Sequence, residues 1–316
     1  MQTDADLIII GAGPAGLTAA QYGARSNLSV LVLEQLAPGG QALLIDMLEN
    51  YPGIPPGKTG FEFGEDLRRQ AGDFGAQFLS GQAQSLSKEG DVFTVVLGNG
   101  QTKSAPAVII ATGAKHRTLD IPGEKEFSGR GVSYCATCDG PFFKNKKIFV
   151  VGGGDAACDE AQYLSKLTGQ VIMIHRRERF RAQKALAERV LANPNITVRF
   201  NTVMQEIKGD DKVASVVLAG TDGASCEENA DAVFVFTGTI PQTSLVSGVS
   251  GGLKAELDGA GCIVTDACMA SSVPGLFAAG DVRATPFRQV ITAAADGAVA
   301  AHCAAAYIDS LKGQAY

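Results

Sequence analysis

The chain has 316 residues, 46% of them hydrophobic and 19% charged, which suits about two globular α/β domains and excludes a disordered or fibrous protein. Its net charge of −6 argues against a general nucleic-acid binder. The acidic start MQTDAD differs from a signal peptide, no run approaches the ~20 apolar residues of a membrane span, and the seven cysteines form no secreted disulfide framework. We therefore expect a cytoplasmic protein with no membrane or nucleic-acid partner.

The first predicted element is a dinucleotide-binding unit at residues 11–34, GAGPAGLTAAQYGARSNLSVLVLE, which follows the apolar run LIII. The pattern predicts a strand, a glycine turn, a helix and a second strand. Gly11 permits the tight turn, Gly13 lets the backbone approach a pyrophosphate, and Gly16 keeps the helix close to the sheet. The helix N-terminus then offers free N–H groups and the positive end of its dipole to the phosphates. Glu34 ends the second strand, where its carboxylate suits the ribose hydroxyls of a nucleotide without a 2′-phosphate.

The next motif, GIPPGKT at residues 53–59, resembles a phosphate-binding P-loop. That loop requires four residues between its glycines, and this chain has three, two of them proline. We predict an ordinary loop.

Two cysteines lie two residues apart in YCATCDGPFF, residues 134–143. Such a pair can hold a zinc ion, cycle between dithiol and disulfide, or be inert. A structural zinc site needs a second pair of ligands, but the chain has no second Cys-x-x-Cys, and its three histidines, at positions 116, 175 and 302, are scattered. We predict no metal and favour the redox pair, in which one thiol attacks a partner and the other resolves the mixed disulfide.

Asp139 directly follows the second cysteine. A carboxylate in this position is a candidate proton donor and acceptor for thiolate chemistry. It can equally cap the turn before Pro141, and the two roles are compatible. The five other cysteines are expected to be small packing residues.

A second dinucleotide unit follows at residues 152–175, GGGDAACDEAQYLSKLTGQVIMIH, after the apolar run KIFVV. It aligns with the first unit without a gap, and Ala-Gln-Tyr recurs in it. Gly152, Gly154 and Ala157 occupy the positions of the three glycines of the first unit. A single G-x-G-x-x-G is weak support for a nucleotide site, whereas two copies in register argue against a chance match.

The second unit ends differently from the first. Where the first has a glutamate, the second has His175, followed by Arg176, Arg177 and Arg181. A carboxylate would repel a 2′-phosphate, whereas guanidinium groups bind it in bidentate fashion. We infer a 2′-OH dinucleotide in the first site and NADP in the second. The alternative is a solvated basic helix face.

The strands AVIIATG at 107–113 and AVFVFTG at 232–238 each close a nucleotide domain. The chain then continues through a Gly- and Ser-rich loop to the buried strand of SSVPGLFAAGDV and to an Ala-rich segment, RQVITAAADGAVAAHCAAAYIDSL, that predicts a helix. This last part lacks a complete nucleotide unit. We therefore predict a first domain made of residues 1–115 and 245–316, with residues 116–244 inserted as a second domain.

Together these motifs resemble the low-molecular-weight thioredoxin reductases, FAD- and NADPH-dependent members of the pyridine nucleotide-disulfide oxidoreductase family. The resemblance covers nearly the whole chain and rests on GAGPAG, PGGQ, ENYPG, ATGA, IPGE, SYCATCDG, GGGDAA, HRRERFR, AAGDVR and RQVITAA. It implies an α/β fold with two Rossmann-like dinucleotide-binding domains of three layers each (ββα), the NADPH domain being inserted into a discontinuous FAD domain. It also implies a homodimer.

The resemblance assigns site residues as well. The predicted FAD residues are Gly11, Gly13, Pro14, Ala15, Gly16, Glu34, Gln35, Gly40, Gln41, Asn50, Thr112, Gly113, Asp281, Arg288, Gln289 and Val290. The last three would face the isoalloxazine edge, where a helix N-terminus stabilises the anionic reduced flavin. The predicted NADP residues are Gly152, Gly154, Asp155, Ala156, Ala157, His175, Arg176, Arg177, Arg181 and Gly238.

The function implied by the resemblance is thioredoxin-disulfide reduction. Electrons would pass from NADPH to FAD, then to a Cys135–Cys138 disulfide, and on to oxidised thioredoxin, with Cys138 next to the flavin and Cys135 attacking the substrate. Nicotinamide and disulfide would take turns at the flavin, with the linkers near Gly113 and Gly238 as hinges. One alternative is another acceptor, a peroxiredoxin partner or glutaredoxin-like protein. A second alternative is a flavin redox sensor without turnover.

Overall fold

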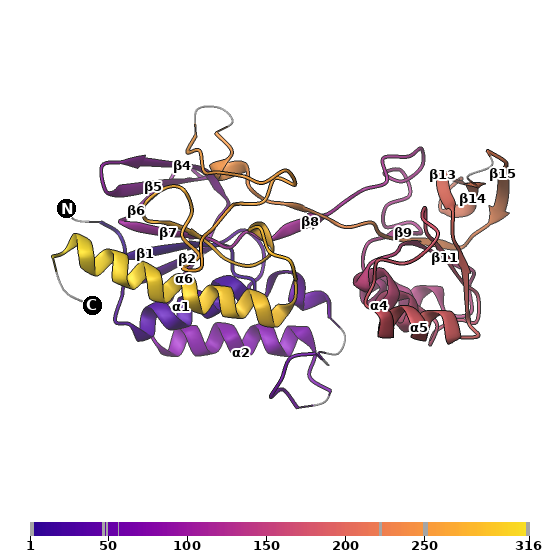
Figure 1. Cartoon of the computed structure of the whole chain (residues 1–316), viewed down its shortest axis with the longest axis horizontal. Coiled ribbons are helices and arrows are strands. Elements are labelled where there is room, and N and C mark those ends of the chain that lie inside the picture. The colour runs from indigo at the N-terminus through magenta and orange to yellow at the C-terminus, as the bar shows by residue number, and fades with distance from the viewer. Residues whose placement is uncertain are drawn as a thin grey trace. The chain divides into compact units, whose positions relative to one another are not determined.

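The computed structural model describes residues 3–45, 48, 50–55, 57–220, 223–248 and 252–313, and it divides the chain into two compact units (Figure 1). The first unit comprises Met1–Lys115 and Ile240–Tyr316, and the second comprises His116–Thr239. The second unit thus ends five residues before residue 244, where we expected the inserted domain to end. The reason is that Leu245 and Val246, close to the predicted border, already pack into the core of the first unit.

A five-stranded parallel sheet forms the centre of the first unit, in the order β18-β7-β1-β2-β3. Its strands are β1 (Leu7–Ile10), β2 (Val30–Glu34), β3 (Gln77–Ser80), β7 (Ala107–Ile110) and β18 (Leu276–Ala278). Continuous apolar runs such as LIII suit strands that are buried on both faces. Because β18 comes from the C-terminal segment and pairs with β7, this unit is discontinuous in sequence.

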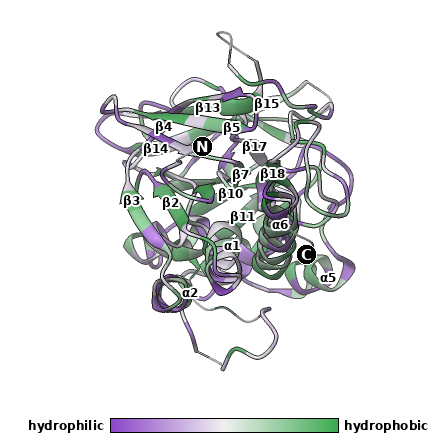
Figure 2. Cartoon of the chain, turned by 90° about the vertical axis from the view of Figure 1, so that its left-hand side faces the viewer, coloured by the Kyte–Doolittle hydropathy of each residue, from purple (hydrophilic) through white to green (hydrophobic). Residues whose placement is uncertain are grey.

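Two layers cover this sheet (Figure 1). One face carries the helices α1 (Pro14–Arg25), α2 (Gly60–Asp73) and α6 (Val290–Leu311), and the other carries an antiparallel sheet of β4 (Ala83–Glu89), β5 (Val92–Leu97) and β6 (Thr102–Ala105). Successive side chains of a strand point to opposite faces. Leu7 and Ile9 therefore join the core beneath the helices, whereas Ile8 joins the core beneath the antiparallel sheet. Figure 2 shows β2 in the green of hydrophobic residues and the outer helix α2 largely in purple.

The second unit repeats this layering. Its parallel sheet has the order β12-β11-β10-β16-β9, from β9 (Val132–Ser133), β10 (Ile148–Gly152), β11 (Val171–Ile174), β12 (Ile196–Arg199) and β16 (Ala232–Phe236). The helices α4 (Asp155–Leu164) and α5 (Lys184–Ala192) cover one face, and β13 (Thr202–Gly209), β14 (Val213–Gly220) and β15 (Ser225–Asn229) cover the other. Both units are therefore Rossmann-like, with the predicted ββα layers.

Short elements complete the described chain. They are η1 (Gly40–Leu44), β8 (Ala114–His116), α3 (Ala136–Asp139), η2 (Gly140–Phe143), β17 (Thr239–Pro241), η3 (Ser244–Val246) and η5 (Gly280–Val282). The segments β8 and β17, which include the two borders between the units, pair as a two-stranded sheet.

The helix α6 is long and apolar enough, by length and composition, to cross a membrane. In the structure, however, Ala300, Ala301, Ala304 and Ile308 are buried in the core that α6 shares with α1. This is the packing of a core helix. The two helices approach so closely that a Cβ added at Gly297 would collide with the carbonyl oxygen of Ala15.

We predict that Gly297→Ala destabilises the protein although alanine is the better helix former. Alanine contributes about 1 kcal/mol of helix propensity, but its methyl group forces α6 away from α1, and such overpacking costs about 1–3 kcal/mol. The matched control is Gly72→Ala in α2, where an added Cβ meets open space. The control should gain up to about 1 kcal/mol. Guanidinium denaturation followed by circular dichroism measures both changes, and a Gly297→Ala variant as stable as the control would refute the packing argument.

Candidate functional site

The first glycine turn lies between β1 and α1. Gly11 has φ +103°, and a Cβ at this position would collide with the carbonyl oxygen of Ala111 on the strand beside it. A Cβ at Gly16 would collide with the carbonyl oxygen of Gly11, so the helix lies directly against the turn. Helix α1 begins at Pro14, and no side chain caps its N-terminus at Gly13. Its first free N–H groups, from Ala15 onward, are therefore available to a phosphate, and the turn fits a dinucleotide.

Glu34 lies beside this turn at the end of β2. Its carboxylate accepts hydrogen bonds from the N–H of Ala12 at 2.7 Å and from the N–H of Leu36 at 2.9 Å. The two bonds orient the carboxylate and leave lone pairs for ribose hydroxyls. The neighbouring predicted residue, Gln35, is exposed.

Several predicted flavin residues bring together segments that are distant in sequence. The Gln41 side chain donates to the Ala114 carbonyl at 2.6 Å, and the Asn50 amide donates to the Gln289 side chain at 2.8 Å. Thr112 donates through its hydroxyl to the Gln242 carbonyl at 2.7 Å. Within the first unit these bonds join η1 to the start of β8, the loop at Asn50 to the start of α6, and the segment after β7 to the loop at Gln242. Two glycines add to this arrangement: Gly113 has φ +66°, and a Cβ at Gly40 would lie 2.9 Å from the Cα of Gly13.

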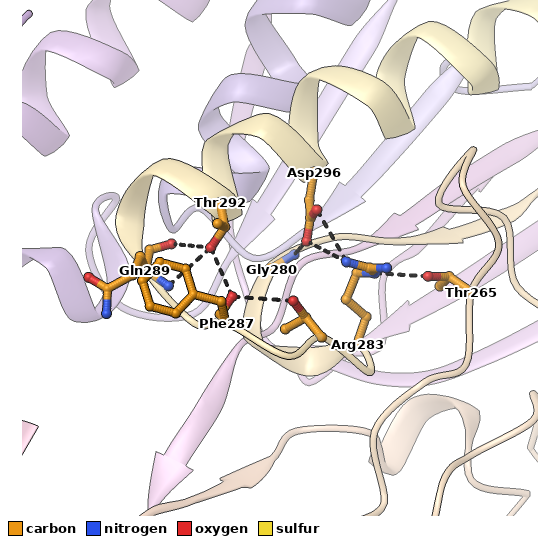
Figure 3. Close-up of polar contacts among 8 residues, drawn as sticks. Thr265, Gly280, Arg283, Phe287, Gln289, Thr292 and Asp296 are labelled. Atoms are coloured by element: carbon orange, nitrogen blue, oxygen red, sulfur yellow. Dashed lines mark hydrogen bonds and ion pairs between the residues drawn. The ribbon is translucent and has the colours of Figure 1, made fainter. Parts of the chain in front are cut away.

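The start of α6 is a capped turn. The N–H of Gln289 donates to the hydroxyl of Thr292 at 3.0 Å, and the helix begins at Val290 (Figure 3). The exposed Arg288 precedes it, and one of its guanidinium nitrogens lies 3.3 Å from the sulfur of Cys262.

A buried ion pair that the motifs did not reveal holds the neighbouring loop (Figure 3). Arg283 and Asp296 lie 3.1 Å apart with side chains only 14% and 12% exposed, and Asp296 also accepts the N–H of Gly280 at 3.1 Å. Arg283 donates in addition to the Thr265 hydroxyl at 2.8 Å. Asp296 therefore holds η5, which contains the predicted flavin residue Asp281. The pKa of Asp281 is raised above its usual value, because burial of the carboxyl outweighs the opposing effect of the nearby positive charge of Arg288.

The second glycine turn lies between β10 and α4 and has the same construction. A Cβ at Gly152 would collide with the carbonyl oxygen of Phe236, and Ala157 is fully buried below the turn. Helix α4 has Gly154 as its N-cap, again without a side-chain cap. This turn also fits a dinucleotide phosphate. Of the two remaining residues, Ala156 is exposed, whereas the Asp155 carboxylate accepts two bonds of 2.8 Å from Gln183.

His175 is placed differently from the three arginines predicted with it. The imidazole is 6% exposed and contacts the rings of Phe180 and Phe200. A Cβ at Gly153 would collide with it. Burial first, and the positive charge of Arg181 second, lower the pKa of His175. A neutral, buried imidazole supports the glycine turn and supplies no charge to a 2′-phosphate.

Arg176, Arg177 and Arg181 are exposed at the end of β11. The backbone N–H of Arg181 donates to the carbonyl of Gly153 at 2.7 Å, so the basic segment is attached to the glycine turn. Gly238, at the end of the strand beside the turn, has φ +112°, and its carbonyl accepts the N–H of Arg117 at 2.8 Å.

The predicted redox pair lies at the start of α3, within the second unit. Cys135 is disulfide-bonded, whereas five other cysteines are free; the side chain of Cys138 lies outside the described part of the chain. Ser133 organises this turn: its hydroxyl accepts the N–H of Cys135 at 3.1 Å and lies 2.6 Å from the Asp139 carboxylate. Ser133 is buried, and sequence reasoning missed it because a single serine before a cysteine pair carries no spacing signal.

The segment before Cys135 is also anchored. The Tyr134 hydroxyl donates to Glu124 at 2.9 Å. Burial first, and this carboxylate second, raise the pKa of Tyr134 well above its usual value, so the phenol stays protonated. Glu124 is 1% exposed and also accepts the N–H groups of Leu119 and Asp120. The tyrosine and the glutamate therefore tie the redox turn to the chain that enters the second unit.

Comparison with known proteins decides the family. Residues 5–297 match the model of the pyridine nucleotide-disulphide oxidoreductases. The chain belongs to this family. It is 56% identical to the thioredoxin reductase of Treponema pallidum, over 99% of this chain and 100% of that one. It is 44% identical to the thioredoxin reductase of Listeria innocua, over 97% of this chain and 95% of that one.

Solved structures agree. The Lactococcus lactis thioredoxin reductase in its FR conformation has a TM-score of 0.91 and 40% identity, covering 97% of this chain and 100% of that one. The T. acidophilum thioredoxin reductase has a TM-score of 0.89 and 34% identity, covering 98% and 100%. These matches confirm the predicted fold, the resemblance to low-molecular-weight thioredoxin reductases and the two cofactors, FAD and NADPH. The predicted enzyme class, an NADPH-dependent disulfide reductase of the thioredoxin reductase type, is confirmed as well.

We predict that Asp296→Ala lowers both the stability of the protein and its retention of FAD. The substitution leaves the buried Arg283 cation unpaired and the Gly280 N–H without its acceptor, a loss of about 3 kcal/mol. The matched control is Glu65→Ala, which breaks an ion pair whose two side chains are more than 40% exposed, and it should cost less than about 1 kcal/mol. Urea denaturation and the flavin-to-protein absorbance ratio after gel filtration measure the effects. Equal costs for the two variants would show that Asp296 does not hold η5.

Proposed function

We propose that the first unit binds FAD, that the second binds NADPH, and that the enzyme transfers electrons through Cys135 and Cys138 to thioredoxin or a thioredoxin-like protein. The observation that carries this proposal is a disulfide-bonded Cys135 in a chain with two uncapped helix N-termini at glycine turns. A disulfide reductase of this class needs those three parts: two dinucleotide sites and a redox-active cysteine. When bound, FAD accepts a hydride from NADPH and passes the electron pair to a disulfide.

Different residues of the chain bind the two nucleotides in this proposal. Ala15 and Gly16, at the N-terminus of α1, bind the FAD pyrophosphate, and Glu34 binds the adenosine ribose. The corresponding turn of α4 binds the NADPH pyrophosphate, with Arg176 and Arg177 on its 2′-phosphate. His175 contributes by supporting the turn beneath them.

The redox turn carries the thiol chemistry. Cys135 attacks the disulfide of the acceptor, Cys138 resolves the mixed disulfide, and Asp139 holds or delivers the proton. Ser133 keeps the Asp139 carboxylate beside the cysteine turn through its contact of 2.6 Å. Asp139 thus serves in proton transfer and in the local turn together, as its position in the sequence allows.

Two further proposals concern the compartment of the enzyme and its oligomeric state. Its relatives lead us to propose a cytoplasmic homodimer. Sedimentation equilibrium at micromolar concentration tests the dimer, and a mass equal to one chain of 32.7 kDa would exclude it.

We predict that Cys135→Ser separates the two halves of the reaction. The variant should still bleach its flavin absorbance with NADPH under anaerobic conditions, because both nucleotide turns are intact, but it should lose reduction of oxidised thioredoxin. The control is Cys226→Ser, which removes an exposed free cysteine of the same unit and should retain both steps. Thioredoxin reduction that survives in Cys135→Ser would overturn the assignment of the attacking thiol.

A glutaredoxin-like acceptor that is reduced faster than thioredoxin by the wild type would overturn the assignment of the partner.

The choice of cofactor provides a second prediction. Replacing Arg176 and Arg177 with alanine should reduce the preference for NADPH over NADH, as a ratio of kcat/KM values, roughly a hundredfold, since each charge-assisted bond to the 2′-phosphate is lost. Arg189→Ala, which removes an exposed arginine of α5 outside the basic segment, is the control and should leave the ratio unchanged. A wild-type enzyme that uses NADH as well as NADPH would refute the phosphate assignment.

A further inference from the structure

Two of the free cysteines form a pair in the first unit, separate from the redox turn. Cys268 is exposed, Cys303 is partly buried, and Cys268 lies near enough to Cys303 to affect the pKa of its thiol. Cys268 lies in the loop before β18, and Cys303 lies in α6, 35 positions further along the chain. Sequence spacing alone could not have paired them.

A closed turn holds Cys268 in place. The Asp266 carboxylate accepts the N–H of Cys268 at 2.8 Å and the N–H of Ala270 at 2.9 Å. The N–H of Asp266 in turn donates to the Ala270 carbonyl at 3.0 Å. Hydrogen bonds thus join the two ends of the turn, residues 266 and 270, and also hold the N–H of Cys268 between them. The position of the Cys268 backbone is therefore well defined.

Packing holds this turn against the face of α6 that carries Cys303. The N–H of Ala278, in β18, donates to the carbonyl of Met269 at 3.0 Å. Next to it in β18, Phe277 contacts the ring of Tyr307 with centroids 6.4 Å apart. Tyr307 follows Cys303 by four residues and shares its face of the helix. The turn, β18 and this helix face belong to one hydrophobic core, which includes Met269 and Cys303.

We propose that Cys268 and Cys303 form a second oxidisable dithiol, which a low-molecular-weight disulfide converts into an intramolecular disulfide. The Cys268 thiolate attacks the small disulfide, forms a mixed disulfide and releases one thiolate. Cys303 then loses its proton and attacks the Cys268 sulfur, which releases the second small thiol. The pair loses two electrons and two protons, and the small disulfide gains them. Because the site needs neither flavin nor nicotinamide, it is independent of the proposed relay.

The order of attack follows from exposure. Cys268 is open to solvent, whereas burial first and the neighbouring Cys268 second raise the pKa of Cys303 to about 11. Cys303 is therefore a poor first nucleophile. It reacts once the mixed disulfide has placed an electrophilic sulfur beside it.

Peptide mapping of the full-length holoenzyme tests the proposal. The reduced enzyme is incubated with oxidised glutathione, quenched in acid, alkylated, digested with trypsin and analysed by mass spectrometry. Cys268 lies on the peptide 255–283, which also carries Cys262, and Cys303 lies on the peptide 289–312. Their disulfide therefore appears as one species at the summed mass of the two peptides, with Cys262 alkylated, less two hydrogens. The redox turn lies on another peptide and does not interfere.

Three variants make the result decisive. The linked species should be present in the wild type and absent from Cys268→Ser and from Cys303→Ser. It should persist in Cys262→Ser, because Cys262 shares the peptide of Cys268 but is 1% exposed. A wild type that shows no link, or only a glutathione adduct on Cys268, overturns the proposal. So does a link that survives Cys268→Ser.

Discussion

At both glycine turns the backbone of the turn packs directly against the backbone of the neighbouring strand, without side chains between them. The position of the nucleotide-binding helices depends on this contact. At the first turn the α1 helix lies so close to the strand that the carbonyl of Gly11 occupies the space of a side chain at residue 16. This close packing places the N-terminus of α1 at the edge of the sheet that is formed by the carboxyl ends of the parallel strands. Because no side chain caps either helix, the free N–H groups there are left for phosphate. A larger residue at Gly11, Gly16 or Gly152 would collide with neighbouring atoms and move the helix, and the binding groups with it.

The two turns are alike in backbone but differ in the charge that follows them. The first is followed by Glu34, whose carboxylate is oriented by two N–H groups, and the second by exposed arginines around a buried histidine. In the function we propose, one backbone design serves two nucleotides, and the side chains at the end of the second strand of each unit distinguish them. His175 shows the limit of reading such a segment by charge alone. It lies in a basic run, yet it contacts Phe180 and Phe200 and supports the turn from below.

Sequence reasoning reached the features that are local in the chain. Apolar runs such as LIII and KIFVV predicted buried parallel strands, and the glycine spacing predicted the turns that follow them. The redox pair was predicted in the same way, from the spacing of its cysteines, and Cys135 is disulfide-bonded in the structure. The contacts that were missed have no spacing signal in the sequence. Ser133 and Asp139 lie six residues apart in one turn, whereas Arg283 with Asp296 and Cys268 with Cys303 bring together separate segments. Of these, Asp296 carried a usable signal, because a carboxylate in the middle of an Ala-rich core helix must have a partner. The predicted border at residue 244 lies five residues beyond the end of the second unit for a related reason: the burial of Leu245 is not visible in a Gly- and Ser-rich stretch.

Helix α6 connects these long-range contacts. Its start is capped beside the proposed flavin edge, Asp296 in its second turn holds η5, and Cys303 further along packs on the turn that carries Cys268. The alanines between them let the helix lie close to α1, so its position is set by packing along its whole length. A rigid helix transmits a constraint at one end to groups at the other. A disulfide at Cys303 would therefore restrain the same helix whose N-terminus we assign to the flavin, which gives the thiol pair a physical route to the cofactor site without contact between the two.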